Sequence, residues 1–312
     1  MQENSSWREN LPRKSPEILG HRPLEGTALL REIWSREFSH THVVQLSPLV
    51  RRLTAPNPGF LTGPGTNAYL VGRREMAVID PGPKHLEHLR RLAEAGQGRI
   101  RWVLATHTHP DHSPAAAPLA KETGAQMLGS AAKPFFWGDS TFLPHRALRD
   151  GDRLESEEFT LRVIATPGHA SNHLCYLLEQ ENILFAGDQV MEGTTVVVAP
   201  PDGSMRQYLA SLERLKAEDI TAIAPAHGRL IAEPRREFQK IIDHRLEREE
   251  QVVSVLEKRQ KAQVAEVVQA LYSHLPRPLQ QVAAFSVQAH LLKLAEEKRI
   301  KGPDLGGRWK II

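Results

Sequence analysis

The sequence predicts an α+β protein whose main domain is followed by a smaller, mostly helical domain. Between His42 and Ala232, short apolar runs rich in β-branched residues alternate with helical or turn segments. Beyond this region the pattern changes to long helical stretches and then to a hairpin-like end, 300–312. Helices followed by a β-ribbon indicate a winged-helix module. We therefore divide the chain into an N-terminal extension (1–40), a main domain (41–233) and a winged-helix-like domain (234–312).

Each element is predicted from local periodicity and end signals. The strands of the main domain are expected at 68–71, 76–79, 101–105, 159–164, 174–178, 183–185, 195–198 and 220–224. Helices are expected at 27–36, 84–95, 204–217, 234–258, 264–274 and 279–298. Ser204 is a suitable N-cap, and Pro234 suits a first helical turn. His85 and His88 lie on a polar helix face, so we expect both to be exposed to solvent.

The bulk composition is typical of a folded, water-soluble chain. Its 312 residues are 40% hydrophobic and 25% charged, and no long uncharged apolar run is present. Residues 1–7 lack the apolar core of a secretory signal. The single cysteine, Cys175, excludes an internal disulfide and stands in a strand-like run, where a buried structural thiol is expected. We therefore expect a cytoplasmic protein that does not associate with membranes.

A dense cluster of metal-ligand side chains follows the predicted strand 101–105. The cluster consists of His107, His109, Asp111 and His112. Imidazole and carboxylate are ligands that suit zinc. In extended backbone His107 and His109 point to the same side, so both can reach a single ion. The segment 39–42 repeats the His-x-His spacing without the Asp-His pair and precedes a strand, so surface histidines are the simpler interpretation there.

Three further ligand-type residues stand on glycine-containing turns at the ends of predicted strands. They are His169, Asp188 and His227. Each turn alone is a weak signal, because Gly-His and Gly-Asp pairs are common in surface turns. The four elements in this order are much more specific, and they predict a metal site assembled from separate loops.

With these residues the chain resembles the metallo-β-lactamase superfamily, and over its whole length the β-lactamase-like protein 2 group, in the glyoxalase II-like hydrolase branch. The resemblance covers roughly residues 43–232 and is supported by the segments 65–72 and 78–82. It implies an αββα sandwich with a dinuclear metal site at one edge. It also implies the ligand sets: His107, His109 and His169 for the first metal, Asp111, His112 and His227 for the second, with Asp188 bridging them.

The implied cofactors are two divalent metal ions. Zinc is the first expectation, and manganese or iron also suits this mixed His/Asp set. Two such ions lower the pKa of a bridging water enough to give hydroxide near neutral pH, and that hydroxide attacks a carbonyl or phosphoryl centre. Asp111 is the candidate catalytic residue, because a carboxylate in this position can orient the nucleophile or shuttle a proton.

The substrate is left open between two classes. The resemblance implies phosphodiester cleavage of single-stranded RNA, and the ten basic and four acidic residues from Lys258 onward give this end a net charge of +6, against +3 for the whole chain. Its few aromatics, Tyr272, Phe285 and Trp309, speak against base stacking. A thioester or ester hydrolase of the glyoxalase II type would use the same site. A third possibility is a C-terminal domain that binds nucleic acid or forms a dimer; the oligomeric state is open.

Four residues near the expected site have supporting roles in this interpretation. His173 is a candidate to support a ligand. Asp80 is expected to close a strand and turn near the metals without binding them. Thr66 and Asn67 are candidates for the cleft wall, with stabilisation of a turn as the stronger expectation.

Overall fold

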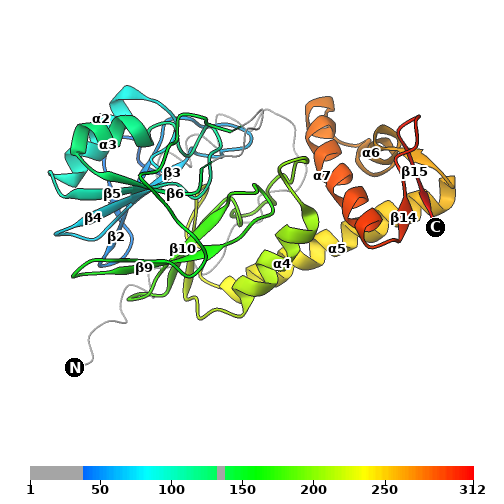
Figure 1. Ribbon diagram of the computed structural model, residues 1–312. Coiled ribbons are helices and arrows are strands. Elements are labelled where there is room, and N and C mark those ends of the chain that lie inside the picture. The colour runs from blue at the N-terminus through cyan, green and yellow to red at the C-terminus, as the bar shows by residue number, and fades with distance from the viewer. Residues whose placement is uncertain (1–37, 132–137) are drawn as a thin grey trace. The chain divides into compact units, whose positions relative to one another are not determined.

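The computed structural model describes residues 38–131 and 138–312 (Figure 1). The predicted helix 27–36 and most of the N-terminal extension lie outside these residues. The described chain forms two compact units. The first unit holds the described residues up to 165, together with 172–195 and 219–234. The second unit holds 166–171, 196–218 and 235–312.

The first sheet of the first unit has the strand order β1-β2-β3-β4-β5-β6-β7 among the described residues. Its strands are β1 (Val44–Gln45), β2 (Val50–Thr54), β3 (Asn67–Val71), β4 (Met76–Ile79), β5 (Ile100–Leu104), β6 (Gln126–Gly129) and β7 (Arg146–Ala147). Strands β1 to β4 pair antiparallel, whereas β4 to β7 pair parallel. The loops after β4 and β5 therefore leave the sheet at the same edge.

The second sheet has the order β12-β11-β10-β9-β8. Its strands are β8 (Arg153–Glu155), β9 (Thr160–Ala165), β10 (Leu174–Leu178), β11 (Ile183–Gly187) and β12 (Ala222–Pro225). Only β11 and β12 pair parallel; the other neighbours are antiparallel. Because β9, β11 and β12 all run in one direction, their carboxyl ends share one edge of this sheet.

Alternation of side chains across the first sheet creates two apolar layers. The layer between the sheets includes Tyr69, Ile79, Leu104, Val163, Tyr176 and Phe185. The layer under α2 (Leu86–Gly96) and α3 (Ala116–Thr123) includes Leu70, Val78, Val103, Leu89, Leu92 and Leu119. Figure 1 shows both helices beside the first sheet. The first unit is thus layered helix, sheet, sheet, and the rigid layers fix where the strand-end loops emerge.

The predicted strand 195–198 is wrong. This β-branched run is a loop without strand pairing. Its carbonyl groups bond to side chains instead of to a neighbouring strand: Val196 O accepts from Arg245 and Val197 O accepts from His169. A run of valines favours extended backbone, but a strand also requires a backbone partner at the right spacing.

The helix α2 corrects a second expectation. His85 is exposed as predicted and is the N-cap, with its side chain accepting a hydrogen bond from His88 N. His88 is buried, which contradicts the predicted exposure, and its Nε2–H donates to Pro81 O at 3.1 Å. Burial lowers the pKa of His88 to about 4, despite that hydrogen bond. The imidazole lies beside the apolar face of Leu89 and Leu92 and is kept neutral there.

This buried histidine should make the protein sensitive to mild acid. The pKa of His88 in the folded chain, about 4, is below its ordinary 6.5, so its contribution to stability is complete above pH 6.5 and is lost as the pH falls towards 4. Between pH 7.5 and 5 the loss should be ~2 kcal/mol of unfolding free energy. Urea unfolding of wild type and His88→Gln at both pH values measures it. The same pH dependence in both proteins would contradict the assignment.

The second unit consists mainly of helices. Its elements are α4 (Met205–Lys216), α5 (Pro234–Arg259, with only Pro234 in the first unit), β13 (Ala262–Gln263), α6 (Val264–Tyr272), α7 (Arg277–Glu296), β14 (Ile300–Lys301) and β15 (Arg308–Ile311). Ser204 caps α4 by accepting from Gln207 N, which confirms the predicted cap. The short strands form a ribbon of order β13-β15-β14, which confirms the hairpin-like end.

The C-terminal helices and ribbon enclose a core of their own. This core includes Val252, Leu256, Val267, Val287, Leu291 and Trp309. A buried carboxylate, Glu249, pairs with Lys293 at 2.7 Å and lies 3.5 Å from Arg299. The arrangement of three helices with a ribbon is that of the predicted winged-helix-like module. Within the described part of the chain, no helix has the length and apolar character needed to cross a bilayer.

Candidate metal centre

The predicted ligands all stand in loops that follow the carboxyl ends of strands. His107, His109, Asp111 and His112 follow β5, His169 follows β9, Asp188 follows β11 and His227 follows β12. Strand β5 belongs to the first sheet and β9, β11 and β12 belong to the second, in which these three strands end at the same edge although their loops are far apart in sequence. Most of these side chains are buried, and Asp111 and His109 are only partly so.

The loop after β5 is held by Asp80, which directly follows β4. Its Oδ1 accepts from Thr106 N at 2.7 Å, and its Oδ2 accepts from Thr106 Oγ1 at 2.8 Å. In the same turn after β4, Gly82 donates its N–H to His112 O at 2.9 Å. These bonds fix the backbone that carries the ligand cluster. Asp80 therefore closes the strand end, as predicted.

Asp80 has a further contact that we did not predict. Its Oδ2 lies 3.0 Å from His112 Nδ1, and both groups are buried. The Nδ1–H donates to the carboxylate, which turns the other nitrogen, Nε2, towards the centre of the site. The signal that could have predicted this contact is topological. Asp80 follows a strand that is parallel and adjacent to the strand that leads into the ligand loop.

His112 Nε2 and His227 Nε2 both face two carboxylates. His112 Nε2 is 3.4 Å from Asp111 Oδ2 and 3.5 Å from Asp188 Oδ1. The corresponding distances from His227 Nε2 are 3.2 Å and 3.4 Å. Ligand atoms bound about 2.0–2.1 Å from one tetrahedral ion lie about 3.3 Å apart. The spacing of these four groups therefore fits donors around a shared cation.

The surroundings of His112 Nε2 favour a positive charge at the centre of the cluster. Its buried Nε2 makes no hydrogen bond within the described residues, and its Nδ1–H is committed to Asp80. Burial opposes a charge on the ring, but Asp111, Asp188 and Asp80 together hold the pKa of His112 well above its usual range. Burial also opposes a charge on Asp111, yet His112 and His227 keep its pKa well below the usual value. The carboxylates therefore favour positive charge at the centre of the cluster, where these side chains are able to bind a metal ion.

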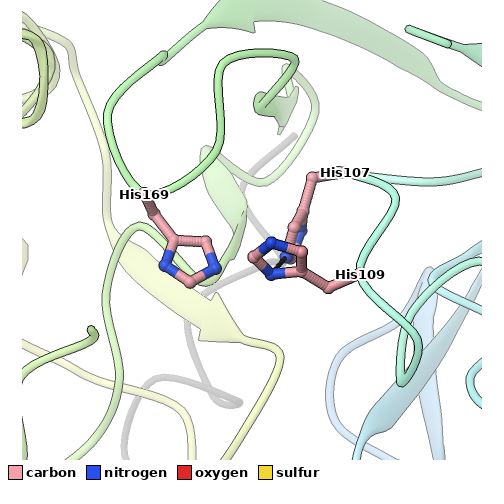
Figure 2. Close-up of side chains that lie close together, drawn as sticks. All are labelled: His107, His109 and His169. Carbon is pink, nitrogen blue, oxygen red and sulfur yellow. Dashed lines mark hydrogen bonds between the residues drawn. The ribbon is translucent and has the colours of Figure 1, made fainter. Parts of the chain in front are cut away.

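A second group of ligand atoms comes from three histidines. Figure 2 shows the rings of His107, His109 and His169 near one another. Each offers one ligand nitrogen, and these atoms lie within 4.8 Å of one another. His107 Nε2 and His109 Nδ1 are 2.9 Å apart. His169 Nδ1–H donates to Val197 O at 2.7 Å, which leaves its Nε2 as the ligand atom. The same limit of 4.8 Å holds for two overlapping sets, His107-His112-Asp188 and Asp111-His112-His227.

Neighbouring side chains hold the ligands in place. His173 Nε2 accepts from Asp188 N at 3.2 Å, so His173 contacts the residue predicted to bridge the metals. Thr66 Oγ1 donates to Asp111 Oδ2 at 3.4 Å. Asn67 Nδ2 donates to Pro225 O at 3.1 Å and to Gly228 O, so it ties β3 to the loop of His227. The structure thus brings all seven predicted ligands together in groups that could hold a metal ion. Their metal-binding roles stay predictions.

Replacing Asp80 by asparagine should lower activity and metal affinity about 10- to 100-fold, the usual effect of losing a carboxylate behind a ligand histidine. An amide presents an N–H where His112 Nδ1–H needs an acceptor, so the ring reorients. Metal content and kcat/KM of Asp80→Asn measure the effect. The matched control is Asp139→Asn, because Asp139 accepts from Ser113 Oγ, beside the same loop, without contacting a ligand. Equal metal affinity in Asp80→Asn and wild type would contradict this role.

Two family models match the chain. The model of the metallo-β-lactamase superfamily matches residues 61–227, and the model of a β-lactamase associated winged helix domain matches residues 264–309. The chain belongs to the metallo-β-lactamase superfamily. This assignment confirms the predicted fold class and the winged-helix character of the C-terminal domain, and it makes the chain a hydrolase-fold protein with side chains able to bind metal.

Individual members of the superfamily are similar over most of the chain. An atrochrysone carboxyl ACP thioesterase of Aspergillus chevalieri is 33% identical, over 86% of this chain and 89% of its own. A β-lactamase-like protein 2 homologue of Caenorhabditis elegans is 28% identical, over 85% and 91%. A solved metallo-β-lactamase family protein from Thermus thermophilus has a TM-score of 0.72 and 24% identity, over 86% and 100%, which shows a shared fold.

Proposed function

We propose that this superfamily member is a dinuclear metal-dependent hydrolase that cleaves thioesters. The observation that carries the metal-dependent part is the buried His112 Nε2, which faces Asp111 and Asp188 at ligand spacing. His107, His109 and His169 would hold one ion and Asp111, His112 and His227 the other, with Asp188 shared. We propose zinc, because the donors are mostly imidazoles. When bound, the ions would provide an activated water near neutral pH and neutralise developing negative charge.

The residues of the chain have separate tasks in this proposal. Asp80 fixes the ring of His112, and the carbonyl of Val197 fixes that of His169. Asp111 is the candidate to accept a proton from the attacking water. Its side chain is 26% exposed against 12% for Asp188, so a proton taken up by Asp111 can pass to solvent.

A thioester is favoured as the substrate by the relatives and by the C-terminal domain. Proteins of Aspergillus chevalieri and Aspergillus fumigatus, 33% and 30% identical, are named as ACP thioesterases. Three cations of the basic end, Lys293, Arg299 and Arg308, are ion-paired with carboxylates, so less charge is free to hold phosphates. Trp309 is buried. Seven of the ten basic residues of this end stay outside such pairs among the described residues, so the choice of a thioester over RNA, the substrate that we predicted first, rests mainly on the relatives.

The test is hydrolysis of a panel of substrates by the metal-loaded protein. Acyl thioesters of coenzyme A and of N-acetylcysteamine are followed by release of thiol, and a short labelled single-stranded RNA by gel. We expect thioester cleavage that stops on chelation and returns on addition of Zn²⁺. Asp188→Ala, purified in parallel, controls for contaminating esterases. Cleavage of RNA with all thioesters left intact would overturn the proposal. The alternative would then be a nuclease whose C-terminal domain binds RNA.

We also propose that the protein acts in the cytoplasm. Its single cysteine, Cys175, is buried, so no thiol is presented for an intermolecular disulfide. A dimer formed through the C-terminal domain is a further prediction. Light scattering on the purified protein would give the molar mass and so decide between monomer and dimer.

A further inference from the structure

The hydrogen bonds of His169 lead away from the ligand cluster and through the second unit, to which His169 belongs. His169 Nδ1–H donates to Val197 O at 2.7 Å, and the neighbouring carbonyl, Val196 O, accepts a hydrogen bond from the guanidinium of Arg245. Arg245 belongs to α5, the long helix that begins the C-terminal domain. Two adjacent carbonyls thus connect a candidate metal ligand with an arginine far away in sequence.

Arg245 occupies an environment that stability alone does not explain. The residue is 3% exposed, its Nε makes no hydrogen bond among the described residues, and within that part of the chain it forms no ion pair. Its guanidinium lies 5.5 Å from the ring centroid of Tyr208, a cation–π contact that offsets only part of the cost of burying a charge. The role of this buried charge is therefore to donate the hydrogen bond to Val196 O.

The loop that carries His169 is bonded closely to the same unit. Ser204 N donates to Gly168 O at 2.8 Å, and Ser211 Oγ donates to Pro167 O at 2.8 Å. Gly168 has φ +150°, and a Cβ there would lie 2.3 Å from Tyr208 Cα. The loop 166–171 therefore follows the position of the segment 196–211, and Arg245 on α5 holds the start of that segment.

We propose that Arg245 is the positioning residue for His169. By fixing the carbonyls of residues 196 and 197, it keeps the His169 Nδ1–H engaged and presents Nε2 as a metal ligand. This inference rests on the proposed metal centre. It means that the C-terminal domain contributes to the occupancy of one of the two metal positions, in addition to any role in recognition.

The test uses the full-length protein freed of metal and titrated with Co²⁺, whose visible absorption reports each bound equivalent. In Arg245→Met we expect one of the two equivalents to bind about 10- to 100-fold more weakly, the size of effect that loss of an outer hydrogen bond to a ligand produces, while the other is unchanged. The matched control is Arg248→Met. Arg248 lies one turn further along α5, stacks on Tyr272 at 4.7 Å and bonds to Gln251, so it is remote from Val196 in its contacts.

The outcomes separate this inference from the proposed function. Wild-type protein that fails to bind two equivalents would refute the dinuclear centre itself. Wild type that binds two equivalents, with Arg245→Met binding both equally well, would refute the role of Arg245 alone. A general loss of structure would weaken both equivalents together and lower the helical circular dichroism, which Arg245→Met is expected to retain.

A reciprocal measurement needs no variant. If Arg245 links α5 to His169, binding of metal must stabilise α5 by the same coupling free energy. Hydrogen exchange of wild type should slow several-fold at residues 241–249 when metal is added. The ribbon β14–β15, in the same unit, is the internal reference. Protection that rises equally in α5 and in the ribbon, or in neither, would overturn the proposal even where Arg245→Met fails to fold.

Discussion

Replacing Asp188 by alanine is expected to remove most of the hydrolytic activity, about a thousandfold in kcat/KM, or ~4 kcal/mol of transition-state stabilisation. Its Oδ1 lies 3.5 Å from His112 Nε2 and 3.4 Å from His227 Nε2. The carboxylate is therefore shared between ligands, and its loss removes a donor and a negative charge together. Rate and metal content are measured on the same preparation.

The control for this variant is Asp219→Ala. Asp219 is an exposed carboxylate of the same unit, and among the described residues it accepts a side-chain hydrogen bond only from Asn182. It should keep full activity and both metal equivalents. Wild-type turnover in Asp188→Ala would contradict the two-metal account. Lost turnover with both equivalents still bound would restrict Asp188 to a role in the reaction itself.

Replacing His109 by alanine is the second change with a large expected effect. His109 Nδ1 is 2.9 Å from His107 Nε2, the shortest separation among the ligand nitrogens described above. Removing it leaves one ion with an incomplete set, so we expect loss of about one metal equivalent and, again, about a thousandfold in rate. The folded state should be little affected, because the side chain is only partly buried.

The chain offers a matched control in its other His-x-His pair. His42 is exposed, and within residues 38–131 and 138–312 its Nδ1 bonds only to the nearby hydroxyls of Ser39 and Thr41. His42→Ala should therefore behave as wild type in both metal content and rate. Equal losses in His42→Ala and His109→Ala would mean that histidine removal acts through stability, and the assignment of His109 as a ligand would fail.

The ligand set could be predicted because each ligand follows a strand whose pattern is local. The apolar runs before His107, Asp188 and His227 each identify a strand end. The parallel strands before Asp188 and His227 end at one edge of the second sheet, whereas the strand before His107 belongs to the first sheet. The roles of Asp80 and Val197 depend on which strands become neighbours and on a hydrogen bond across 28 residues. No local pattern contains that information.

The two wrong predictions have the same cause. The run 195–198 has the composition of a strand, but its carbonyl groups accept hydrogen bonds from side chains instead of from a neighbouring strand. His88 lies on a face of α2 that repeats polar residues, yet it is buried beside the turn of Pro81 and Gly82. In both cases tertiary neighbours overrode a correct local preference.

The loops of the first unit that meet at the strand ends span the chain from His107 to His227. Ions held there would act as removable cross-links that close a loop of about 120 residues. For a covalent bridge, closing a loop of that size lowers the entropy of the unfolded chain by an amount equivalent to about 4–5 kcal/mol. A chain with one cysteine has no disulfide available for this purpose. Metal supply would then set how long the fold persists, as well as how fast it turns over substrate.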